Sequence, residues 1–279
     1  MAWKIVTDSG ASLLDISHLT QDIDYEIVPL SIITDTEEIM DVPGIDLDEF
    51  VEKIKVAKTT SSACPSPDMY LQAFGDADKV ICFTITGTLS GSFGSADVAR
   101  QHALEKNPDR QIHIFDTLSA GPEQDLLIKK LITFIESGLD FDEVVEQIYA
   151  YHQHTDLLFL LESIENLVKN GRVNKMIGSL VGLLNLRLVG ERSSDGRIEL
   201  ANRARGTKKG LKILLDEMIG KGYKGGKVEI AHMGNESLAK TMADRIREQF
   251  SEALIDIRQG SALCYYYAEK NGLMIGFEK

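Results

Sequence analysis

The sequence of 279 residues has few of the features that mark secreted, membrane-spanning or metal-binding proteins. Its three cysteines, Cys64, Cys82 and Cys264, form no CxxC pair and have no metal-site spacing, which suits a reducing compartment and predicts no bound metal. No run of about 18 apolar residues occurs, so we expect no membrane-spanning or stably inserted segment. No signal peptide is evident before the first apolar run. These absences together predict a cytoplasmic protein.

Basic residues are also scarce. The 30 lysines and arginines are outnumbered by 43 acidic residues, and the net charge is −13. Nucleic acid and anionic membrane surfaces are poor partners for such a chain, because both are bound mainly through Lys and Arg. Residues 186–214 are the exception, with eight basic residues against three acidic ones. This stretch is either an ordinary solvated face or a site for an anionic ligand or partner.

Motifs for phosphate-binding loops and for serine hydrolases are missing. Neither GxxxxGK[ST] nor GxGxxG occurs. Residues 87–92 read Gly-Thr-Leu-Ser-Gly-Ser, which is not the GxSxG elbow of a hydrolase. A serine nucleophile would also need a nearby base, and of six histidines only His232, at the end of an apolar run, has a position suited to a site. His232 is more readily interpreted as a structural histidine.

Apolar runs alternate with helical patterns in the first half of the chain, which is typical of βαβ units and a parallel sheet. We expect strands at 3–7, 25–33, 79–85, 111–115 and 157–161. We expect helices at 47–55, 66–74, 92–106, 122–137 and 141–152. Ser66 and Pro67 are a typical N-cap and first helical residue.

The pattern changes near Asp156. Short helices at 164–169 and 175–184 precede strands at 186–191 and 197–202, and Asp195-Gly196 between these strands is a hairpin signal. The last third returns to alternation, with helices at 207–220, 236–250 and 262–270 and strands at 227–232, 253–258 and 273–277. We therefore predict an α/β fold of two domains, 1–156 with a mostly parallel sheet flanked by helices and 157–279 with an antiparallel hairpin.

Three of the expected strands end in clusters of hydroxyl and small residues. These clusters begin at Asp8-Ser9, at Thr86 and at Asp116-Thr117, and a fourth hydroxyl run spans 59–62. The carboxyl ends of parallel strands share one edge, where ligands bind. We therefore expect a site there for a carboxylate or phosphate, held by Ser62 and Ser90, by backbone amides of Gly91 and Ser92 at a helix start, and by Arg205 as the positive charge. Asp8, Ser9, Asp116 and Ser119 are expected mainly to brace the loops.

Short motifs in a fixed order along the whole chain resemble those of one known family. They are the opening Lys4-Ile5-Val6-Thr7-Asp8-Ser9, the Leu89–Ala96 segment against Leu-Ser-Gly-Thr-Tyr-x-Ser-Ala, Pro65-Ser66-Pro67, Asn170-Gly171-Arg172, Asn185-Leu186-Arg187, and Asp195-Gly196 followed by Arg203-Ala204-Arg205-Gly206. At these residues the chain resembles the DegV family of fatty-acid-binding proteins, which serve as the FakB subunit of bacterial fatty acid kinase.

The resemblance implies two α/β domains with an acyl chain buried between them. It implies that Ser62, Ser90 and Arg205 hold the fatty-acid carboxylate. It also implies that a separate ATP-dependent fatty acid kinase phosphorylates the bound fatty acid, while this chain catalyses nothing and needs no cofactor. The basic stretch from Arg187 to Lys212 would then face the kinase or the acyl phosphate.

The chain departs from the family pattern at three places. Ser62 replaces the usual threonine, and Ala63-Cys64 replaces a Ser-Gln pair. The family's His-Thr-Gly-Pro-Gly aligns with 268–272, Ala-Glu-Lys-Asn-Gly, so its histidine is missing, and a phenol of the preceding Tyr265-Tyr266-Tyr267 is a candidate substitute. The competing functions are an acyl hydrolase that uses Ser90 and a small-molecule phosphotransferase of similar architecture.

Overall fold

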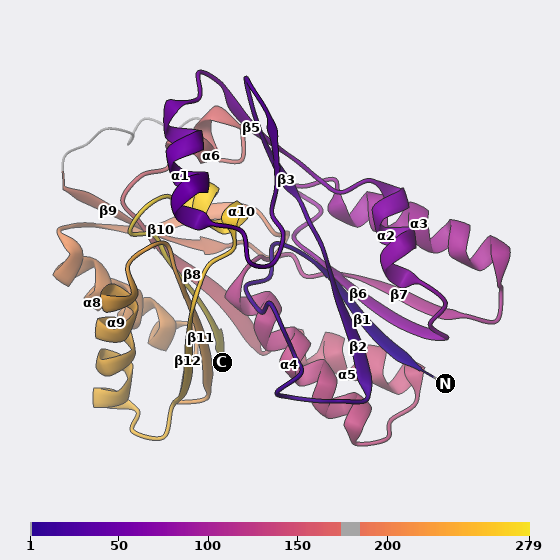
Figure 1. Ribbon diagram of the computed structural model, residues 1–279. Coiled ribbons are helices and arrows are strands. Elements are labelled where there is room, and N and C mark those ends of the chain that lie inside the picture. Colours follow the sequence, from indigo (N-terminus) through magenta and orange to yellow (C-terminus); the bar gives the residue numbers. More distant parts are fainter. Residues whose placement is uncertain (1, 174–184) are drawn as a thin grey trace.

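The computed structural model describes residues 2–173 and 185–279 (Figure 1). The helix expected at 175–184 lies outside the described residues. Within them the chain forms a four-stranded, a three-stranded and a six-stranded sheet with helices packed around them. The predicted α/β class, with a parallel sheet in the first half and an antiparallel hairpin in the second, is confirmed.

The first sheet has the order β2-β1-β6-β7, and all its strands are parallel. Its strands are β1 (Trp3–Asp8), β2 (Ile23–Val28), β6 (Lys79–Thr84) and β7 (Gln111–Asp116). Helices α2 (Pro67–Phe74) and α3 (Ser92–Lys106) cover one face, and α4 (Pro122–Glu136) and α5 (Phe141–His152) cover the other. Consecutive strand residues point to opposite faces, so Ile5 packs toward α4 and α5 while Val6 packs toward α2 and α3.

The single strand expected at 25–33 is wrong, because the structure has two strands there in different sheets. β2 ends at Val28, and β3 (Ser31–Thr34) begins after Pro29-Leu30 and pairs with β4 (Glu38–Met40) and β5 (Thr60–Ala63). Pro29 has no backbone N–H to continue a ladder, which explains the break. The hydroxyl run at 59–62 thus lies mostly on strand β5.

The second half of the chain builds the six-stranded sheet, in the order β10-β9-β8-β13-β11-β12. Its strands are β8 (Thr155–Leu161), β9 (Leu186–Arg192), β10 (Ile198–Arg205), β11 (Lys227–His232), β12 (Leu254–Gln259) and β13 (Leu273–Glu278). Helices α8 (Thr207–Gly220) and α9 (Glu236–Gln249) cover its outer face. The chain enters the six-stranded sheet at β8. The domain boundary predicted at 156/157 stays a proposal.

The inner face of the six-stranded sheet meets the first half of the chain in a shared apolar core. Leu157, Phe159 and Leu161 of β8 point into this core, while Leu158 and Leu160 point toward α8 and α9. The core also receives α1 (Leu47–Val56), α6 (Glu165–Lys169) and α10 (Ala262–Ala268). A strand that is apolar on both faces is thereby buried on both faces.

Helix α4 lies between the two large sheets (Figure 1). Its start approaches β13 so closely that a Cβ on Gly276 would lie 2.5 Å from the backbone nitrogen of Glu123. Only glycine admits this contact. The close approach fixes the α4 start, and with it the loop after β7, against the second half of the chain.

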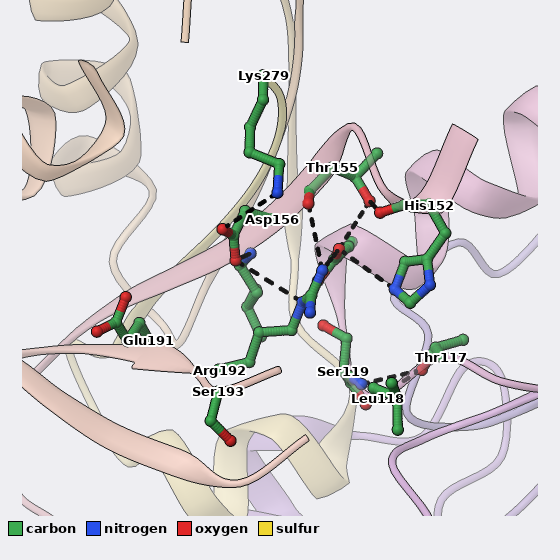
Figure 2. Close-up of polar contacts among 12 residues, drawn as sticks. Thr117, Leu118, Ser119, His152, Thr155, Asp156, Glu191, Arg192, Ser193 and Lys279 are labelled. Atoms are coloured by element: carbon green, nitrogen blue, oxygen red, sulfur yellow. Dashed lines mark hydrogen bonds and ion pairs between the residues drawn. The ribbon is translucent and has the colours of Figure 1, made fainter. Parts of the chain in front are cut away.

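A buried ionic cluster joins the two halves at the same place (Figure 2). Glu123 of α4 is fully buried and accepts hydrogen bonds from Arg192 Nε (2.6 Å) and Nη2 (2.8 Å) at the end of β9. It also accepts one from the Thr155 hydroxyl (2.7 Å), and Asp156 lies 3.7 Å from Arg192 Nε. This bidentate geometry offsets much of the desolvation cost of both charges.

We predict that Glu123→Gln lowers the free energy of unfolding by about 3 kcal/mol, because it leaves the Arg192 guanidinium buried without its main carboxylate partner. The double variant Glu123→Gln/Arg192→Met should recover most of this loss. Urea unfolding of the two variants measures both effects. Lys212→Met, which breaks an exposed pair with Asp216, is the control and should cost under about 1 kcal/mol. A double variant no more stable than Glu123→Gln alone would contradict the account.

Candidate functional site

A cavity of about 370 Å³ lies in the shared core between the two halves of the chain. This volume falls in the range of small-molecule sites. Its walls are mainly apolar and come from β8, β13, α10 and the loops that follow β2 and β6; they include Leu30, Ile85, Leu157, Phe159, Leu161, Leu263, Cys264 and Met274. A cavity with such walls accommodates a long apolar chain.

Four half-buried groups gather on one part of the cavity lining. The hydroxyl of Ser62 on β5 lies 2.7 Å from that of Tyr267 on α10, at hydrogen-bond distance. Burial raises the pKa of Tyr267, against the opposing effects of the Ser62 hydrogen bond and of nearby Arg172. Tyr267 therefore stays a neutral phenol that can donate a hydrogen bond to an anion. We call Ser62, Ser90, Arg172 and Tyr267 the headgroup cluster.

Ser90 lines the cavity immediately before α3. Its hydroxyl lies 3.0 Å from that of Ser92 and accepts a hydrogen bond from the Ser92 backbone N–H at 3.2 Å. Gly91 also lines the cavity, and a Cβ there would lie 2.9 Å from the sulfur of Cys64. Ser92 itself is fully buried. Ser90 and Gly91 thus face the cavity, and Ser92 supports Ser90 from behind.

Arg172 supplies positive charge to this cluster. Its Nε donates to the carbonyl of Leu89 at 3.2 Å, and its Nη1 donates to the carbonyl of Asn170. Within residues 2–173 and 185–279, no carboxylate lies within ion-pair distance of Arg172. By contrast, Arg192 and Arg197 also line the cavity but pair with Glu123 and Asp195. Arg172 is therefore the cation best placed to meet an anionic ligand.

Two predicted site residues lie elsewhere. Arg205 ends β10 at an exposed position and is not one of the described residues that line the cavity. His232 ends β11 and is also outside that set; burial lowers its pKa, and the charges near it are those of Glu236 and Lys240. The structure thus does not bring either residue to the headgroup cluster.

The predicted loop-bracing residues make backbone contacts at the strand ends. Asp8 is fully buried and accepts hydrogen bonds from the N–H groups of Gly10 (3.1 Å) and Ile85 (2.8 Å) and from Gln124 (3.2 Å). Asp116 accepts from the N–H groups of Gly87 and Leu118. These carboxylates tie the loops after β1, β6 and β7 to one another.

Two serines continue this pattern, Ser9 through its hydroxyl and Ser119 through its carbonyl. Ser9 accepts a hydrogen bond from the N–H of Leu30 at 3.0 Å. Ser119 lines the cavity and is buried; its carbonyl accepts from the N–H of Thr86 at 2.9 Å. Ser119 therefore braces the loop through its backbone, and its hydroxyl oxygen is buried.

Comparisons with known proteins identify the architecture. The model of the DegV family, described as an uncharacterised protein family, matches residues 2–279. The chain belongs to the DegV family. It is 46% identical over 279 residues to a DegV domain-containing protein of Streptococcus pyogenes serotype M1, with both chains covered completely. A second DegV domain-containing protein, from Streptococcus pneumoniae strain R6, is also 46% identical, with 100% of this chain and 99% of the relative covered.

Two solved structures of similar proteins contain fatty acids. The Streptococcus pneumoniae Fatty Acid Kinase B3 protein loaded with linoleic acid is 45% identical, with a TM-score of 0.97, over 100% of this chain and 99% of that chain. A DegV family protein from Eubacterium eligens loaded with heptadecanoic acid is 35% identical, with a TM-score of 0.95 and full coverage of both chains. Fatty acids are therefore the ligands found in proteins of this fold and family.

The structure adds Arg172 and Cys64 to the expected site and places Tyr267, one of the three tyrosines named as candidates, on the cavity lining. Tyr267, Arg172 and Cys64 line the cavity. Helical spacing was a usable signal for the first, because residues 263, 264, 267 and 268 fall on one face of α10 and all line the cavity. For the other two, only the packing of distant loops places them together. Among the described residues, no cluster of three or more potential metal ligands occurs, and none of the described helices is long and apolar enough to cross a bilayer.

The buried Asp8 predicts a pH effect on stability. Burial raises the pKa of Asp8 from 3.8 to about 6. The folded protein therefore binds this proton more tightly than the unfolded chain does. The contribution of Asp8 to stability is then full below about pH 4 and is lost as the pH rises through about 6. We expect the stability advantage of the native protein over Asp8→Asn to shrink by about 3 kcal/mol between those limits.

Urea unfolding at a series of pH values and constant ionic strength measures this difference. Asp15→Asn is the control, because Asp15 is exposed and hydrogen bonds from Ser17 lower its pKa, so any pH effect should have the opposite sign. An Asp8→Asn profile parallel to that of the native protein would rule out the proposed titration.

Proposed function

We propose that this protein binds a long-chain fatty acid and presents its carboxylate to a separate ATP-dependent fatty acid kinase, which forms the acyl phosphate. The observation that carries the proposal is the distribution of polarity in one cavity. Its deep walls are apolar and buried, whereas the headgroup cluster is only half-buried. A ligand with an apolar chain and one anionic end complements this arrangement.

The energetics divide between the two ends of the ligand. Burial of each methylene contributes about 0.8 kcal/mol, so the chain supplies most of the affinity. Each hydrogen bond to a charged carboxylate adds about 1.5–3 kcal/mol. We assign the carboxylate to the hydroxyls of Ser62, Ser90 and Tyr267 and to the guanidinium of Arg172, with the backbone amide of Gly91 at the start of α3 as a further donor.

A carrier is favoured over an acyl hydrolase by the surroundings of Ser90. Its hydroxyl contacts Ser92, and no histidine occurs among the described residues that line the cavity. A serine nucleophile needs a base within hydrogen-bond reach. Tyr267 occupies the region where the family pattern has its histidine, and it supplies a neutral donor rather than a base at neutral pH.

The protein purified from its own host should release a long-chain fatty acid on organic extraction, identified by mass spectrometry. The delipidated protein should bind a labelled fatty acid more tightly than the corresponding methyl ester, because the ester lacks the charge that Arg172 and the hydroxyls stabilise. If no acyl chain co-purifies and no labelled fatty acid binds, the carrier function is wrong.

Removing a headgroup hydroxyl should weaken fatty-acid binding without abolishing it. Ser90→Ala and Tyr267→Phe should each raise the dissociation constant about tenfold, as expected for one hydrogen bond to a carboxylate. Tyr265→Phe is the matched control, since Tyr265 lies on the same helix outside the cavity lining. Isothermal titration gives the three constants. If a variant weakened binding of the fatty acid and of its methyl ester by the same factor, the headgroup assignment would be wrong.

Exposed basic residues at the end of β10 and in the first part of α8 are the proposed contact with the kinase. Arg203, Arg205, Lys208, Lys209 and Lys212 are all exposed, in a chain that is otherwise acidic. Lys208 and Lys209 lie in the first turn of α8. A concentrated patch of positive charge on an acidic protein steers and orients a complementary partner.

With the host's fatty acid kinase and ATP, the loaded protein should yield an acyl phosphate that hydroxylamine traps as the hydroxamate, and no product should form without the kinase. Lys209→Glu should raise the carrier concentration needed for half-maximal rate about tenfold at low salt, with fatty-acid affinity unchanged. Lys224→Glu is the control, because Lys224 is also exposed, lies outside this group of basic residues and undergoes the same change of charge. It should have little effect on the rate. Product formed by this protein and ATP alone would show it to be an enzyme.

A further inference from the structure

A second, much smaller space lies beside the main cavity, on the inner face of the six-stranded sheet. Its volume is about 10 Å³, and its described walls come from β8, β9, β10 and α6. We call it the side hollow. Four residues line both the main cavity and the side hollow, namely Phe159, Leu161, Leu167 and Ile198. The side chains of these four residues therefore form the wall between the two spaces.

Phe159 is the largest residue of this wall, and the backbone of β9 determines where its ring lies. In the register of the sheet, Phe159 is paired with Gly190 of β9 on one side and with Met274 of β13 on the other. A Cβ on Gly190 would lie 2.0 Å from Cε2 and 2.5 Å from Cζ of the ring. The ring therefore lies directly on the backbone of Gly190, in the space that a side chain of β9 would occupy.

Gly190 is an unfavourable residue for the middle of a strand. Glycine loses more conformational freedom on folding than other residues do, and it has no side chain to pack. A glycine inside a strand often marks a place where another group approaches the backbone closely. Here that group is the ring of Phe159, so the two residues act together: Gly190 provides the space, and Phe159 forms the wall.

Ordinary core packing does not account for a ring in this position. Protein interiors are packed about as closely as organic crystals, so a core side chain normally has neighbours on every side. Phe159 is 7% exposed, yet it borders unfilled space in both the main cavity and the side hollow. The preceding residue, Leu158, is fully buried in the outer core and is not among the described residues that line either space. The Phe159 ring therefore limits the width of the main cavity at the centre of β8.

We propose that Phe159 determines which acyl chains the cavity accepts, because its ring closes the cavity to a side branch at the level of the centre of β8. The ligand class is then an unbranched chain, since a methyl branch beside the ring would need the space that the ring occupies. This inference rests on the proposed fatty-acid function and adds the residue that sets its selectivity.

The test compares stearic acid with a series of stearic acids that carry one methyl branch at successive chain positions. Isothermal titration with the delipidated full-length protein should show that a branch beside the ring weakens binding about tenfold or more, as expected for one misplaced methyl group in an apolar pocket. Phe159→Ala should remove this penalty at those one or two neighbouring positions and leave the penalties at the other positions unchanged, because it joins the side hollow to the main cavity only there.

Leu158→Ala is the matched control. It also removes an apolar side chain from β8, but from the face that packs toward α8 and α9, so it should keep the native profile. Phe159→Leu removes less of the ring's packing and should relieve part of the penalty at the same positions. It provides the same comparison if Phe159→Ala does not fold.

The outcomes distinguish this inference from the proposed function. If the Phe159 variants keep the full penalty, or relieve it equally at every position, the ring is not the selective element, although the carrier function stands. A native protein that binds every branched isomer as tightly as stearic acid would overturn the inference in the same way. If neither stearic acid nor any of its branched isomers binds, the proposed function is wrong as well.

Discussion

The parallel alignment of β1, β6 and β7 is the constraint on which the site depends. Because neighbouring parallel strands end at one edge, the loops at Asp8, Thr86 and Asp116 meet there, although more than 70 residues separate the first two in sequence. The six-stranded sheet then closes over this edge through α4 and the shared apolar core. The cavity is the part of that junction that the side chains of the two halves do not fill.

The loops at this edge are held mainly by carboxylates and hydroxyls that accept from backbone N–H groups. Asp8 and Asp116 each bind two backbone amides, and Ser9 binds a third loop. This arrangement keeps loop bracing separate from ligand binding, because the braces lie behind the lining and the hydroxyls of Ser62 and Ser90 remain directed to the cavity. The hairpin turn adds to the closure, since Gly196, with φ +78°, packs where a Cβ would lie 2.1 Å from the Thr86 hydroxyl.

Local patterns predicted most of the fold, and distant packing determined what they could not. Strand and helix periodicities located the parallel sheet and the Asp195-Gly196 hairpin, because both depend on patterns among residues close together in the sequence. They failed at 25–33, where a largely apolar segment hides a change of sheet at Pro29. In the site, strand-end position predicted Ser90 and the hydroxyl run predicted Ser62, and both line the cavity. Arg205, the cation expected at the strand-edge site, ends β10 outside the cavity lining, whereas Arg172 reaches the cavity through the packing of a short turn against Leu89.

In the proposed function the two ends of the cavity have different roles. The apolar walls supply the affinity for the ligand, and the headgroup cluster orients its carboxylate for reaction. A buried apolar chain holds the ligand through an energy that grows with its length, so the headgroup contacts need not be strong. In the proposed binding mode, neutral hydroxyls and Arg172, which has no carboxylate partner among the described residues, orient the carboxylate at a half-exposed position without enclosing it. Because burial raises the pKa of the Tyr267 phenol further above the neutral range, carboxylate binding through it, as proposed, should not depend on pH near neutrality. Under this proposal the phenol of Tyr267 takes the place of the family's histidine as a headgroup donor, while the apolar walls of the cavity hold the chain.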